Sequence, residues 1–138
     1  MSINLTFFKK FVYISISASW VAISNPVDMS AITRHLGPVE GNKQVVEPLL
    51  RDEGVDAVVL ILLASPSIPA EKYSSLPELS SKYPQKPTYV TFTGDKQSFD
   101  QLKVFLEHHS IPVFVPLENA FETLQVLCRC REALDLQG

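Results

Sequence analysis

The chain has 138 residues, of which 46% are hydrophobic and 20% are charged, and its formal net charge is −3 at pH 7. This length holds one domain with one core, and the composition is ordinary for a globular fold. The acidic balance gives no electrostatic reason for a nucleic-acid partner, and we expect none.

The N-terminal segment, residues 1–18, is predicted to be an apolar extension outside the domain. Its apolar run is shorter than the roughly 20 residues that a membrane span needs. The sequence SWVAIS that follows is also a poor signal-peptide cleavage site. We therefore expect a cytoplasmic protein with no membrane partner. The segment is either a start unrelated to the domain, or an extra strand or arm that covers an apolar surface.

Short apolar runs alternate with amphipathic stretches over residues 19–138, which we assign to one domain. The run SWVAIS, residues 19–24, predicts a first strand. Apolar pairs spaced four residues apart over 42–51 predict a helix, in which Pro48 marks a late start or a kink. The run 55–64 is apolar almost throughout, which is typical of a strand buried on both faces of a parallel sheet.

The second half of the chain continues this alternation. Ser67 and Pro69 suit a helix start, and that helix is predicted to end before Pro84. The remaining predicted elements are a strand over 86–94, a helix capped by Asp95, a strand over 110–116, and a last helix with Ala120, Leu124, Leu127 and Cys128 on one face.

Strands and helices that alternate with short connections predict a mostly parallel sheet with helices on both faces. Right-handed crossovers then give an α/β fold, a small flavodoxin-like three-layer sandwich. In such folds ligands bind at the carboxyl ends of the strands. The candidate residues in loops that face an anion or a partner are therefore Asn25, Asp28, Ser65, Ser67, Thr93 and Gly94.

Each of these candidates also has a purely structural interpretation. A helix that begins just after Ser65 and Ser67 presents free N–H groups to an anion, but a plain capped helix explains the same serines. Asn25 and Asp28 fix a turn equally well through side-chain hydrogen bonds to the backbone.

Known catalytic and metal-binding patterns are missing from the sequence. It has no glycine-rich phosphate loop and no G-x-S-x-G nucleophile elbow. His35 is predicted to lie in a loop, while His108 and His109 end a helix, and none has a second ligand at metal spacing. Cys128 and Cys130 point about 200° apart on a helix, which predicts two unlinked thiols in a reducing compartment. We expect no catalytic residue, no metal and no cofactor.

Four segments, taken in chain order, resemble those of a known protein family. They are SNPVDM followed by a helix, LLRDEGVDAVVLILLASPSI, KPTYVTFTG and LEHHSIPVFVPLENAFETLQVL. From about Val21 to Leu134 the chain resembles the flavodoxin-like domain of NDP-forming acyl-CoA synthetases. It is similar, more distantly, to the C-terminal domain of the succinyl-CoA synthetase β subunit. These enzymes join an acid to coenzyme A through a phosphohistidine. They divide the work among a CoA-binding domain, a histidine-bearing domain and an ATP-grasp module.

The resemblance implies a helix that begins around Ser65–Pro69 and faces the phosphohistidine. The sequence departs from the family's pattern at this helix start, because ASPSIP stands where the succinyl-CoA synthetase relatives have a Gly-Gly pair. The other modules do not fit into this length, so the resemblance implies a stand-alone or fragmentary domain that is non-catalytic by itself. It would associate with the missing ligase subunits or form a homo-oligomer. SNPVDM then looks like a join between domains. The alternative is a small flavodoxin-like module that binds a nucleotide or anion at the strand ends.

Overall fold

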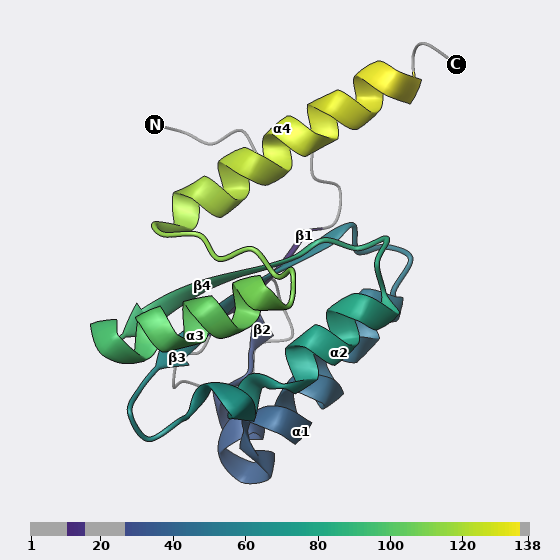
Figure 1. The fold of residues 1–138 in the computed structure, drawn as a ribbon. Coiled ribbons are helices and arrows are strands. Elements are labelled where there is room, and N and C mark those ends of the chain that lie inside the picture. Colours follow the sequence, from purple (N-terminus) through teal and green to yellow (C-terminus); the bar gives the residue numbers. More distant parts are fainter. Residues whose placement is uncertain (1–10, 16–26, 136–138) are drawn as a thin grey trace.

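The computed structural model describes residues 11–15 and 27–135. The strands are β1 (Phe11–Ser15), β2 (Val27–Asp28), β3 (Ala57–Ala64) and β4 (Thr88–Gly94). The α-helices are α1 (Ser30–Arg51), α2 (Ser75–Lys82), α3 (Lys96–His108) and α4 (Leu117–Asp135), and η2 (Ala70–Tyr73) is a 3₁₀ helix (Figure 1).

The strands form one parallel sheet in the order β2-β1-β3-β4. The longest pairing joins β3 to β4, from Val58 opposite Thr88 to Ala64 opposite Gly94. The predicted mostly parallel α/β fold is therefore confirmed.

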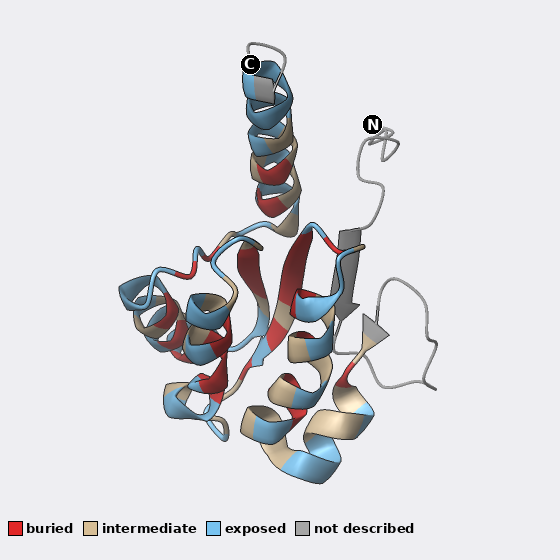
Figure 2. Cartoon of the chain, turned by 90° about the vertical axis from the view of Figure 1, so that its right-hand side faces the viewer, coloured by how far each residue is buried: buried red, intermediate tan, exposed pale blue. Residues whose placement is uncertain are grey.

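The side chains of β3 alternate between two hydrophobic clusters, as the period of a strand requires. Val58, Leu60 and Leu62 lie in the larger cluster, with α1, α2 and α3. Ala57 and Val59 lie in the smaller cluster, with α4. Helices thus cover both faces of the sheet (Figure 1), and the strand expected to be buried on both faces is confirmed (Figure 2).

The first helix differs from the prediction. It begins at Ser30, so His35 lies on a helix and not in a loop. Its non-helical residue is Gly37, with φ 79° and ψ 164°, which is followed by Pro38. Positive φ is open to glycine at little cost, and proline cannot donate the next helical hydrogen bond. The break therefore lies at Gly37, whereas Pro48 lies within the second half of the helix.

The helix predicted to start at Ser67 begins later. The backbone N–H of Ile68 donates to the Ser65 carbonyl at 2.9 Å and closes a turn. Pro69 then precedes η2, and regular α-helix starts only at Ser75. The expected helix start at Ser65–Pro69 is wrong, because these residues form a turn and a 3₁₀ segment. The helix ends before Pro84, as expected.

The strand predicted over 110–116 is also wrong. Within this segment, Val113 forms an isolated parallel bridge to Val90. The Phe114 N–H donates to the Val90 carbonyl at 2.9 Å. Pro112 and Pro116 have no N–H to donate, so they interrupt the ladder that a full strand would make.

Part of the predicted N-terminal extension lies in the sheet. Phe11–Ser15 forms β1, which pairs with β2 on one side and β3 on the other. Five residues of the predicted extension are therefore part of the sheet, between β2 and β3. The strand predicted at residues 19–24 and the candidate Asn25 lie outside the described residues, and a boundary at residue 18 stays a prediction.

Candidate functional site

The carboxyl ends of the parallel strands meet at one edge of the sheet. Leu63 is opposite Thr93 and Ala64 is opposite Gly94, so the loops that begin at Ser65 and Asp95 are neighbours. Asp28 ends β2 at the same edge, since β2 and β1 are parallel to β3. The structure therefore places Asp28, Ser65, Ser67, Thr93 and Gly94 at or just after strand ends on this edge, while an anion or partner at these residues stays a prediction.

The two serines of the candidate loop bond to each other. Their hydroxyl oxygens are 2.8 Å apart, and the Ser67 N–H donates to the Ser65 hydroxyl at 3.3 Å. Together with the Ile68 N–H, which donates to the Ser65 carbonyl, these bonds hold a local turn. The backbone N–H groups expected to meet an anion are thus used inside the loop.

The close approach of two strand ends explains why position 94 is occupied by a glycine. Its φ is 123°, and a Cβ at this position would lie 2.2 Å from the Ala64 carbonyl oxygen. The same oxygen accepts the Asp95 N–H at 2.9 Å. A glycine is therefore required here by backbone geometry. Thr93 beside it is exposed.

Asp28 has the turn-forming role that the sequence predicted as one of two interpretations. Its Oδ1 accepts the Ser30 N–H at 2.8 Å, at the start of α1. A carboxylate in this position also interacts favourably with the positive end of the helix dipole.

Asp95 caps α3, as predicted. Its Oδ2 accepts both the backbone N–H and the hydroxyl of Ser98, each at 2.8 Å. These Ser98 donors lower the pKa of the Asp95 carboxyl from its ordinary value of 3.8. Hydrogen bonds to a carboxylate stabilise its charged form.

Asp95→Asn is expected to lower the stability of the chain at neutral pH, because asparagine keeps the cap but loses the charge. The folded-state pKa of Asp95 is depressed, so its charge contributes stability above the ordinary value of 3.8, and this is lost as pH falls through the folded-state pKa. Urea unfolding at neutral pH and well below 3.8 measures the difference between the variant and the wild type. A difference that persists at the acidic end would contradict this account. Asp100→Asn on the same helix, which removes an exposed carboxylate paired with Lys96 at 3.3 Å, is the control for loss of a surface charge that does not cap the helix.

A cavity of about 290 Å³ lies beside this edge. It is a half-open hollow between the first half of α1, Leu63 at the end of β3, and Ile68 and Tyr73 of the following segment. Its described lining consists of Ser30, Thr33, Arg34, Pro38, Asn42, Leu63, Ile68 and Tyr73.

The break at Gly37 gives this cavity its shape. It turns α1 so that Gly41 packs against Thr33, where a Cβ on Gly41 would lie 2.9 Å from the Thr33 side chain. Asn42 then becomes 1% exposed and lines the cavity together with Arg34. Neither residue was a candidate from the sequence, because the spacing of Arg34 and Asn42 is informative only once the helix break between them is known.

Tyr73 lines the cavity, and a hydrogen bond holds its side chain in place. Its hydroxyl donates to the Leu63 carbonyl at 2.9 Å, and its side chain is 3% exposed. Burial raises the pKa of Tyr73 to about 12, so the phenol is neutral near pH 7 and does not act as a base.

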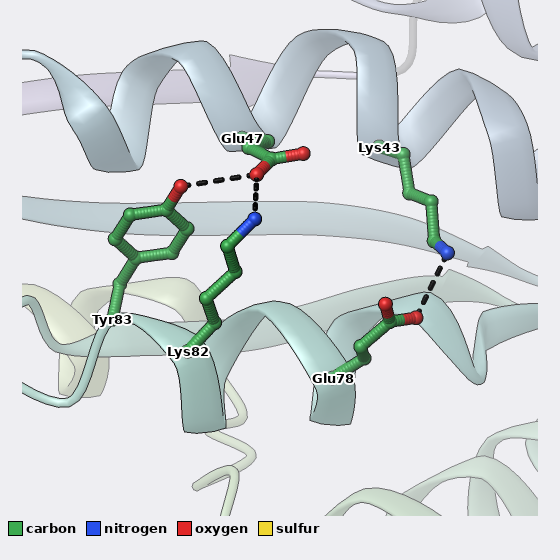
Figure 3. Close-up of polar contacts among 5 residues, drawn as sticks. All are labelled: Lys43, Glu47, Glu78, Lys82 and Tyr83. Atoms are coloured by element: carbon green, nitrogen blue, oxygen red, sulfur yellow. Dashed lines mark hydrogen bonds and ion pairs between the residues drawn. The ribbon is translucent and has the colours of Figure 1, made fainter.

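The second half of α1 is tied to α2 by polar contacts at the surface. The Lys43 ammonium lies 2.8 Å from Glu78, and Glu47 accepts from both Lys82 and the Tyr83 hydroxyl (Figure 3). The two donors lower the pKa of Glu47. These contacts join the two helices, and each of the four charged groups in them already has a partner.

The remaining candidate groups form no reactive cluster. Among the described residues, no three His, Cys, Asp or Glu side chains are placed to hold a metal ion. The His109 ring nitrogen Nδ1 lies 2.7 Å from the Phe105 carbonyl at the end of α3, the local role expected near a helix C-terminus. Cys128 and Cys130 are unlinked thiols, as predicted. No helix in the described part of the chain is long and apolar enough to cross a membrane.

Comparison with known proteins finds a weak similarity to an acetate–CoA ligase. The chain is 30% identical over 112 residues to acetate–CoA ligase (ADP-forming) II of Archaeoglobus fulgidus. The match covers 79% of this chain and 16% of that protein. No protein-family model matches the chain, and no solved structure matches it.

Proposed function

We propose that the chain is a flavodoxin-like domain of an NDP-forming acyl-CoA synthetase, either stand-alone or a fragment. By itself it has no ligase activity, and it acts in the cytoplasm by association with CoA-binding and ATP-grasp partner domains. The observation that carries the proposal is the similarity to the archaeal ligase, which extends over 79% of this chain but only 16% of that protein.

The strand order supports the flavodoxin-like assignment. The sheet runs β2-β1-β3-β4, and the bridge from Val113 to Val90 adds a fifth position next to β4. This is the 2-1-3-4-5 order of flavodoxin-like sheets.

The last helix supports association with a partner. Ala120 and Leu124 on α4 are buried against the sheet, at 0% and 2% exposed. Leu127 and Leu134 continue this stripe at helical spacing and are 46% and 70% exposed. This part of α4 projects beyond the sheet (Figure 2). Apolar side chains aligned on a projecting helix are typical of a protein–protein interface.

A chimera of the archaeal relative tests the proposal. Its matched segment is replaced by this chain, and acetyl-CoA formation from acetate, ATP and CoA is measured. We expect activity in the chimera, and none in the deletion of that segment or in the isolated chain. Acyl-CoA formation by the isolated chain would overturn the proposal, as would a chimera no more active than the deletion.

Leu127→Asp in the chimera tests the role of α4. We expect it to lower the chimera's activity, whereas Glu122→Gln, an exposed position on the same helix, is expected to leave it unchanged.

A further inference from the structure

We infer that the projecting half of α4 binds an acidic amphipathic helix of a partner protein. The inference rests on the proposed function, because it names the chemistry of the partner that covers α4 there. The surface concerned is an apolar stripe whose residues recur at the spacing of one helix face. We call it the α4 stripe, and it consists of Val126, Leu127, Cys130, Ala133 and Leu134.

The α4 stripe is open to a partner. Val126, Leu127 and Leu134 are 56%, 46% and 70% exposed, and Cys130 and Ala133 are exposed as well. The stripe lies on the part of α4 that stands clear of the sheet (Figure 2). At the rise of an α-helix it is about 12 Å long and one side chain wide. A narrow apolar ridge of this kind packs well against a second helix.

Two arginines flank the α4 stripe. Arg129 and Arg131 precede and follow Cys130, so they lie about 100° to either side of the centre of the stripe. Both are exposed, and neither makes an ion pair with a described residue. Glu132 lies about 200° from Cys130, on the far face of the helix, and Glu122 lies about two turns before Cys130, in the half beside the sheet. At Cys130 both edges of the stripe are therefore positive.

This charge pattern favours an acidic helix over a second copy of the chain. In a symmetric pair of α4 helices centred on Cys130, parallel or antiparallel, the flanking arginines of the two copies meet each other. Like charges placed together at an interface are unfavourable. A helix with an apolar stripe and glutamates on either side complements both features. An anionic membrane would also attract a basic amphipathic helix, but the net charge of −3 opposes that contact.

Two synthetic peptides of about 15 residues test this pairing on the full chain, since shorter helices are marginal in water. Both form an amphipathic helix with a leucine stripe, which glutamates flank in one peptide and lysines in the other. Fluorescence anisotropy of the labelled peptides measures binding. We expect the glutamate peptide to bind with a Kd on the order of 100 µM, as suits a small interface, and more weakly as salt is added. The lysine peptide is expected to bind at least about tenfold more weakly.

Alkylation of the two thiols shows where the glutamate peptide lies. Cys130 is exposed at the centre of the α4 stripe, so its reaction with iodoacetamide is expected to slow about twofold when roughly half of the chain is occupied. Cys128 lies about 200° away on the same helix and is the internal control. Its reaction rate is expected to stay unchanged. Mass spectrometry of the alkylated chain measures both rates.

Reversal of the flanking charges gives a result that partial unfolding cannot imitate. Arg129→Glu with Arg131→Glu is expected to prefer the lysine peptide over the glutamate peptide. Lys72→Glu with Lys96→Glu makes the same change of net charge on η2 and α3, which pack on the opposite face of the sheet, and is expected to keep the wild-type preference. Leu134→Gln removes an exposed part of the stripe and is expected to weaken the glutamate peptide about tenfold.

Several results would overturn the inference. They are equal binding of the two peptides, no binding of either, and loss of the preference in the control pair on η2 and α3. Protection of Cys130 by phosphatidylserine vesicles, or a dimer in sedimentation that Leu134→Gln dissolves, would assign the stripe to another occupant. An active chimera without the peptide preference would overturn this inference alone. An inactive chimera together with the peptide preference would overturn the proposed function and leave the acidic-helix site standing.

Discussion

Gly94→Ala is expected to destabilise the chain by roughly 3 kcal/mol or more. Two causes add at this position. The φ of 123° is strained for any residue with a Cβ, and the new methyl would lie 2.2 Å from the Ala64 carbonyl oxygen. That oxygen belongs to the backbone of β3 and cannot move aside alone, so relief of the contact means separating the ends of β3 and β4. Urea unfolding followed by circular dichroism measures the loss.

Gly37→Ala is the control that separates the two causes. Gly37 also has positive φ, 79°, but nothing lies within 4 Å of a Cβ built there. Its substitution is expected to cost about 1–3 kcal/mol from backbone strain alone. A loss at Gly94 no larger than the loss at Gly37 would mean that the strand ends separate easily, and would contradict the close contact seen here.

Leu106→Ala is expected to cost about 2–5 kcal/mol, the usual range for a buried leucine, and to shift the urea midpoint without a new intermediate. Leu106 is 0% exposed and lies in the larger hydrophobic cluster, between α3 and the sheet. Removal of its side chain leaves a cavity that the parallel strands cannot fill by a small movement.

Val104→Ala on the same helix provides the comparison. Val104 is 70% exposed, and alanine has the higher helix propensity, so the change is expected to be neutral or slightly stabilising. Similar losses at the two positions would show that α3 does not pack on the sheet as described.

The buried strand and the cap of α3 were predictable because each depends on residues close in sequence. The parallel sheet was predictable because strands that alternate with helices pair in parallel. The apolar run of β3 specifies a strand with two buried faces whatever surrounds it. Asp95 needs only the N–H groups of the next turn to act as a cap. The ligase relationship was also predictable, since it depends on the order of several segments.

The errors arose where the outcome depends on distant contacts or on a competing local bond. A helix start after Ser67 was a reasonable prediction, but the Ser65–Ser67 hydroxyl pair at 2.8 Å and the Ile68 N–H made a turn instead. The last predicted strand failed because its two prolines limit the ladder to one bridge.

The candidate cavity was not predictable for a related reason. Asn42 and Arg34 line the same cavity from the two sides of the break in α1, where Gly41 packs against Thr33. Their spacing in the sequence does not indicate this shared cavity, since a continuous helix would place the two residues apart along its axis.

The projection of α4 beyond the sheet divides the molecule into two regions of different thermodynamic character. The half of α4 near Ala120 and Leu124 opens only when the smaller cluster opens, because these side chains are buried in it. The half beyond Leu127 has little core to hold it, so its free energy of opening depends mainly on local helix propensity, which is small for isolated helices. A partner that covers Leu127 and Leu134 would therefore order this half while the sheet stays unchanged, and the free-energy cost of that ordering would lower the affinity of the complex.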